Sequence, residues 1–188
     1  MKSLVIALSA LAFVVGTTFA AGAQQTQGMD RNMDRNATTA STQGLSKTDQ
    51  KFAMNAAKDS QFEIQMSQLA AQKATNPQVK EFAQKLADDH TKLSSDLSGL
   101  ASQKGLTLPT SLDRKDQKEL DKFSKESSSK FDKKYLSAMV KDHKKDIKSF
   151  KSEAKSGKDP DLQNWASSHI SALQEHLTMA QNLEKNMK

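Results

Sequence analysis

The chain has 188 residues and no cysteine, with 28 lysines and arginines against 22 aspartates and glutamates and a net charge of +6. The absence of cysteine excludes disulfides, a thiolate nucleophile, thiolate metal ligands and lipid attachment through cysteine. The length is sufficient for one domain with its own hydrophobic core.

The first 23 residues have the pattern of a signal peptide. Lys2 precedes an apolar run over Leu4–Val15, and Ala21-Gly22-Ala23 is a typical cleavage site. This run is shorter than the roughly 20 apolar residues of a membrane-spanning helix, and no later segment is apolar enough to span. The sequence therefore predicts an exported protein, periplasmic or secreted, with no transmembrane span after cleavage, and it leaves association with the outer membrane open.

Residues 24–44 are rich in Gln, Asn, Thr, Ser and Gly, and they repeat the tetrapeptide Met-Asp-Arg-Asn. Such a composition buries too little apolar surface to offset the entropy lost on ordering. We therefore expect a disordered tether over 24–44 and a folded domain over 45–188.

Within 45–188, apolar residues recur every three or four positions, which predicts helices. Ser46 is expected to cap the first helix, which ends before Asn76-Pro77. There the asparagine caps the second helix and the proline takes its first position, and Gly105 ends that helix. Three further helices are predicted in the second half, over residues 113–124, 129–156 and 160 onward.

The two halves of this domain resemble each other. A shift of 83 positions places Asn76-Pro77 on Asp159-Pro160 and Phe82 on Trp165. No alternating β-type run is present. Two helical hairpins joined by a long connection predict an all-α fold, a ferritin-like four-helix bundle with a short extra helix in the crossover.

Polar side chains on apolar helix stripes are the informative deviation in this domain. All four histidines and Glu63 fall on such stripes. Glu63 and His90 are equally far from the first helical turn, and His143 and His176 are equally far from the second. All four are therefore expected near mid-height, with His169 about two turns away.

Imidazole and carboxylate groups from facing helices are what helical bundles use to hold zinc, iron or manganese. The sequence thus predicts a candidate transition-metal site of Glu63, His90, His143 and His176. Nearby acids would add ligands or orient the rings: Asp88, Asp89, Asp142 and Asp146. Two alternatives stay open, namely a buried polar layer that satisfies its own hydrogen bonds without metal, and stripes rotated toward solvent.

Several segments together resemble the bacterial secreted family known as domain of unknown function 4142. They are Asn76–Ala83 leading to Asp88-Asp89-His90, Lys104–Pro109, Phe131–Tyr135, Asp142-His143, Gly157–Pro160 and His176. The resemblance covers about Leu45 to Asn182 and implies a ferritin-like four-helix fold and a location in the cell envelope. It implies no established activity.

Two functions follow as hypotheses. Residues 113–158 hold 15 lysines and arginines against 9 acids, which favours an envelope-associated binding or stress-protection protein whose basic face meets anionic surfaces. The alternative is a metal-binding bundle. Nucleic acid is not expected as a partner, since no aromatic pattern accompanies the basic residues. No catalytic motif is present, and the Glu-x-x-His of di-iron bundles is absent, because Ala87 precedes His90 by three positions.

Overall fold

The computed structural model describes residues 44–187. The predicted signal peptide and almost all of the predicted tether lie outside this range. The described part consists of five helices and has no β-strand, which confirms the predicted all-α class. The helices are α1 (Lys47–Lys73), α2 (Pro77–Gln103), α3 (Arg114–Ser124), α4 (Ser128–Ser156) and α5 (Pro160–Asn186).

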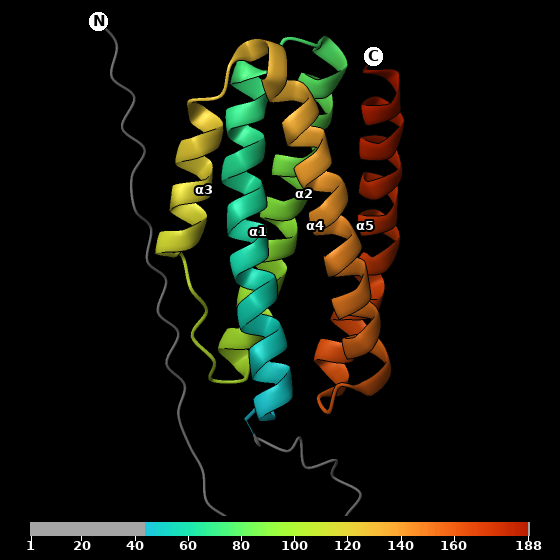
Figure 1. Cartoon of the computed structure of the whole chain (residues 1–188). Coiled ribbons are helices and arrows are strands. Elements are labelled where there is room, and N and C mark those ends of the chain that lie inside the picture. The colour runs from blue at the N-terminus through green and yellow to red at the C-terminus, as the bar shows by residue number, and fades with distance from the viewer. Residues whose placement is uncertain (1–43, 188) are drawn as a thin grey trace, which may run out of the picture. The chain divides into compact units, whose positions relative to one another are not determined.

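The four long helices form a bundle of two hairpins (Figure 1). Helix α1 packs chiefly against α2, and α4 packs chiefly against α5, with smaller interfaces between α1 and α4 and between α2 and α5. The short α3 lies beside α1 in the crossover and returns the chain to the opposite end of the bundle (Figure 1). This is the predicted four-helix arrangement with one long connection. Among residues 44–187, no helix combines the length and apolar character needed to cross a membrane.

The helix ends follow the local signals of the sequence. The Ser46 side chain accepts a hydrogen bond from the backbone N–H of Asp49, and Asn76 and Asp159 cap α2 and α5 in the same manner. Gly105 adopts a φ of 70°, the left-handed conformation that closes a helix at low cost for glycine. Gly157 ends α4 for another reason. A Cβ there would lie 2.5 Å from Glu153 Oε1 and 2.8 Å from Glu153 O, so only glycine fits.

Two buried aspartates tie each hairpin to the turn of the other. Asp132, at the start of α4, accepts hydrogen bonds from the backbone N–H groups of Thr75 and Asn76 and from the Thr75 hydroxyl, the last two at 2.8 Å. Asp49, at the start of α1, accepts from the backbone N–H groups of Lys158 and Asp159, both at 3.0 Å. Charge-assisted bonds of this kind are stronger than neutral ones. They fix how the two hairpins dock.

Apolar side chains fill the bundle in two separate clusters. One cluster lies toward the α4–α5 turn and is built around Phe52, Phe150 and Trp165. The other lies toward the α1–α2 turn and is built around Phe82, Phe131 and Tyr135. The helical positions between the two clusters hold Glu63, His90, His143 and His176. The bundle is therefore divided at mid-height by a polar layer.

The capping role of Asp132 leads to a stability prediction. Replacement Asp132→Ala leaves two backbone N–H groups of the α1–α2 turn without their partner, so we expect it to lower the free energy of unfolding by about 2–4 kcal/mol. Urea unfolding followed by circular dichroism measures this change. The exposed Asp96→Ala serves as the control and should change stability little. A loss for Asp132→Ala as small as that of the control would contradict the assigned role.

Glu153 gives a second prediction, on the pH dependence of stability. Its side chain is 4% exposed. Burial, the charge of Asp49 and a hydrogen bond to Asp49 raise the pKa of Glu153 from 4.5 to about 7. The folded state therefore binds this proton more tightly than the unfolded state, and the stabilisation is complete below about pH 4.5 and is lost as pH rises through 7.

The variant Glu153→Gln mimics the protonated form at every pH. Between about pH 5 and about pH 8, the wild type should therefore lose stability relative to Glu153→Gln in urea titrations. Other titrating groups are the same in both proteins and cancel in the comparison. A constant difference between the two proteins across this range would refute the assignment.

Candidate metal site

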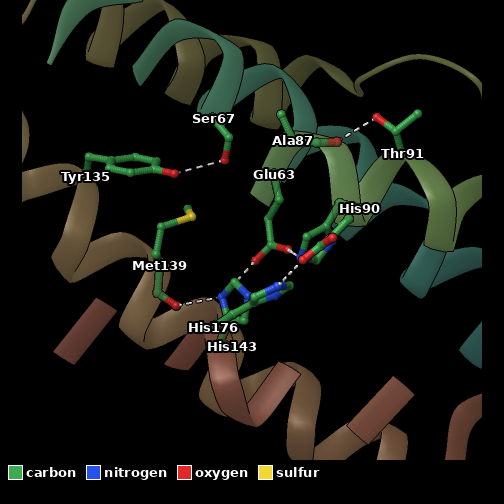
Figure 2. Close-up of polar contacts among 10 residues, drawn as sticks. Glu63, Ser67, Ala87, His90, Thr91, Tyr135, Met139, His143 and His176 are labelled. Carbon is green, nitrogen blue, oxygen red and sulfur yellow. Dashed lines mark hydrogen bonds and ion pairs between the residues drawn. The ribbon is translucent and has the colours of Figure 1, made fainter. Parts of the chain in front are cut away.

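The mid-height polar layer contains one ionisable side chain from each long helix. Glu63 comes from α1, His90 from α2, His143 from α4 and His176 from α5, and none is more than 2% exposed. Figure 2 shows the Glu63 carboxylate pointing toward the imidazoles of His90 and His143, with His176 beside them. The structure thus brings together all four residues that the sequence had marked.

The carboxylate of Glu63 is at the centre of the group. Its Oε2 lies 2.9 Å from His90 Nε2, and its Oε1 lies 3.4 Å from His143 Nδ1. The three imidazole ring centroids lie 5.3–5.6 Å from one another. The three rings are therefore close enough for one ion to reach a nitrogen of each, and the Glu63 carboxylate lies beside two of them.

Two of the imidazoles are anchored from outside the group. His143 Nδ1 lies 3.0 Å from the backbone oxygen of Met139, and His176 Nε2 lies 2.8 Å from Asp89 Oδ2. Carbonyl and carboxylate oxygens accept hydrogen bonds, so these ring nitrogens donate. The opposite nitrogens, His143 Nε2 and His176 Nδ1, then carry the lone pairs. Both are buried without a hydrogen-bond partner.

This pattern is the one found around metal-ligating histidines, whose second nitrogen donates to a carbonyl or carboxylate. One potential ligand nitrogen from each of His90, His143 and His176 lies within 4.8 Å of the other two. In a tetrahedral zinc site with bonds of 2.0–2.1 Å, ligand nitrogens would be about 3.4 Å apart. Since 4.8 Å is the upper limit of their present spacing, the ligand nitrogens would approach one another by up to about 1.4 Å on binding an ion.

The charges within the layer are unequal. Burial alone would raise the pKa of Glu63, but the neighbouring histidines outweigh it and lower the value to about 2. Burial alone would lower the pKa of His90, but the charge of Glu63 and the contact with its carboxylate raise it. Burial lowers the pKa of His143, and it lowers that of His176 to about 4. Near pH 6.5, Glu63 and His90 therefore form an ion pair, and the other two rings are neutral.

The remaining predicted residues have different surroundings. His169, also placed on an apolar stripe by its spacing, is half-buried, and its ring lies 4.8 Å from that of Trp165. Its Nδ1 contacts the backbone oxygen of Trp165, so it does not join the polar layer. Asp89 orients His176, as the sequence suggested for the acids near the histidines. Asp88 instead accepts a hydrogen bond from Gln84 on the surface.

The sequence analysis did not predict one hydrogen-bonded pair beside the site, Ser67 and Tyr135. Ser67 and Tyr135 share a buried hydrogen bond of 2.9 Å one turn from Glu63 (Figure 2). Asp146, considered as a ring-orienting residue, is 5% exposed, and burial followed by the charge of Glu63 raises its pKa well above 3.8. Ser67 lies four residues after Glu63, one helical turn away, and this spacing was the signal that could have pointed to the Ser67–Tyr135 contact.

The chain belongs to the family described as domain of unknown function DUF4142, whose model matches residues 34–183. No curated protein matches the sequence. Among solved structures, the fold is similar to a DUF305 fragment from Deinococcus radiodurans, with 9% identity and a TM-score of 0.65 over 76% of this chain and 99% of that one. The family description names no activity, and at this identity the structural likeness concerns the fold alone.

Proposed function

We propose that this protein binds one divalent transition-metal ion between Glu63, His90, His143 and His176. The observation that carries the proposal is the pair of buried lone-pair nitrogens, His143 Nε2 and His176 Nδ1, which have no hydrogen-bond partner. A buried polar atom without a partner is costly. A metal ion would satisfy both nitrogens at once.

The donor set narrows the choice of ion. Three imidazoles and one carboxylate suit zinc, iron, manganese or copper(II), and the absence of thiolates disfavours soft ions such as copper(I). Around zinc, these four side chains would complete a tetrahedral shell and leave no open position for a substrate. We therefore infer that the site binds or sequesters metal and does not catalyse a reaction.

The chain's N-terminal sequence supports a location outside the cytoplasm for this activity. We propose that residues 1–23 are removed during export and that residues 24–44 tether the bundle within the envelope or extend from it. A ligand set without cysteine is insensitive to thiol oxidation in such a compartment.

A second candidate function rests on a basic groove beside α3. The groove has a volume of about 710 Å³. Its lining includes five basic side chains: Arg114, Lys115, Lys118, Lys122 and Lys134. Glu119 and Glu126 also line it, and Glu126 pairs with Lys134. The excess of positive charge supports attachment to an anionic envelope surface such as phospholipid or lipopolysaccharide headgroups.

The metal proposal predicts a measurable stoichiometry. Protein purified without a histidine tag, stripped with a chelator and returned to zinc or cobalt should bind one ion per chain, measured by elemental analysis and calorimetry. The ion should also raise the melting temperature, because it binds the folded state. His90→Ala and His143→Ala should each weaken binding at least about 100-fold, because each removes a direct ligand, and Asp89→Asn about 10-fold.

His169→Ala is the matched control, since it removes an imidazole outside the polar layer and should leave affinity unchanged. Affinity should also fall as the pH is lowered, because protons compete for the ring nitrogens and His90 must lose its proton to bind. Wild-type protein that holds no stoichiometric metal and is not stabilised by it would refute the proposal.

The basic groove predicts salt-sensitive binding to vesicles that contain anionic lipid. Arg114→Gln/Lys118→Gln/Lys122→Gln should weaken sedimentation with such vesicles by about 10–100-fold at low salt. The control triple variant Lys144→Gln/Lys148→Gln/Lys151→Gln removes the same charge from exposed positions of α4 outside the groove. Equal losses in both triple variants, or binding that ignores added salt, would argue against a groove-specific role.

A further inference from the structure

A small acidic pocket opens between α1, α3 and α4 and reaches the polar layer. Its volume is about 220 Å³, and five carboxylates line it together with three lysines. The carboxylates are Asp59, Glu63, Asp116, Glu119 and Asp142. We propose that this pocket is the entrance through which a divalent cation reaches the histidine site, an inference that rests on the proposed metal-binding function.

Glu63 connects the two. Its side chain is 1% exposed, yet it forms part of the pocket lining, and its two oxygens lie 2.9 Å and 3.4 Å from nitrogens of His90 and His143. The inner wall of the pocket is therefore itself a predicted ligand. An ion that reaches Glu63 from the pocket would have the imidazoles of His90 and His143 on the other side of the same carboxylate.

Carboxylates outnumber basic groups in the lining of the pocket, five against three. The carboxylates therefore repel one another across the pocket. Several acids in one concave site concentrate cations, because low-dielectric walls strengthen the local field. A divalent ion would relieve this repulsion as it enters.

Lys145 is positioned to restrain entry. Its Nζ lies 2.8 Å and 2.7 Å from the two oxygens of Asp59, so the ion pair joins α4 to α1 across the pocket lining. The Lys145 side chain is 62% exposed, and exposed ion pairs contribute little to stability. The pair can therefore open readily. While it is closed, the ammonium group of Lys145 lies at the pocket and repels an approaching cation.

The test is the rate of cobalt(II) binding to the full-length mature protein, followed by visible absorption in a stopped-flow instrument. Glu119→Gln/Asp142→Asn removes two pocket charges and leaves the Lys145–Asp59 pair in place. We expect association about 5–10-fold slower at low ionic strength, with a smaller effect at high salt. Lys145→Gln should have the opposite effect and speed association. The control Glu81→Gln/Asp96→Asn removes the same charges from exposed positions of α2 and should load at the wild-type rate.

The outcomes separate the two proposals. If the wild type binds no cobalt, both fall. If it binds cobalt, but the pocket variant and Lys145→Gln load at the wild-type rate, the entrance is refuted and the metal site stands. Entry on the other side of the site, past the half-exposed Asp89 that contacts His176, would give this second result. Weaker equilibrium binding by the pocket variant at an unchanged association rate would likewise overturn the entrance.

Discussion

The buried carboxylate of Glu63 is the constraint on which the centre of the bundle depends. An ionised carboxylate that is 1% exposed between two apolar clusters costs several kcal/mol of desolvation unless positive charge faces it. His90 supplies that charge through its contact at 2.9 Å, and the neutral rings of His143 and His176 add polar neighbours. Since these partners come from the other three long helices, the electrostatic requirement of one side chain fixes the relative height of all four.

Internal symmetry explains the frame of the site but not its chemistry. Asp49 and Asp132 are 83 positions apart, and each caps the turn of the opposite hairpin. Glu63 and Asp146 have the same spacing and are both buried. The imidazoles break the repeat, because Leu173 stands 83 positions after His90. The duplicated hairpin therefore provides buried acids in both halves, whereas the histidines gather around only one of them.

The sequence predicted what depends on local signals. Ser46, Asn76-Pro77 and Asp159-Pro160 place helix starts, because capping is decided within one turn. The equal distances of Glu63 and His90 from one turn predicted that they would lie at one level. Local pattern does not say what packs against a face. The cap that Asp49 provides to residues 109–110 positions away, and the packing of His169 on Trp165, depend on contacts between distant helices. Neither could be predicted from spacing.

The distribution of ligands also bears on what a bound ion would do to the protein. Packing is extensive within each hairpin and much smaller between the two hairpins. Glu63 and His90 belong to one hairpin, and His143 and His176 belong to the other. An ion coordinated by all four would cross-link the hairpins where they are otherwise held by the layer's own contacts and by the Asp49 and Asp132 caps at the two ends. Its binding energy would then be expressed as docking of the hairpins, because metal binding and folding are coupled when the ligands come from separate units. A bundle of this kind would hold an ion by closing around it, which suits retention better than turnover.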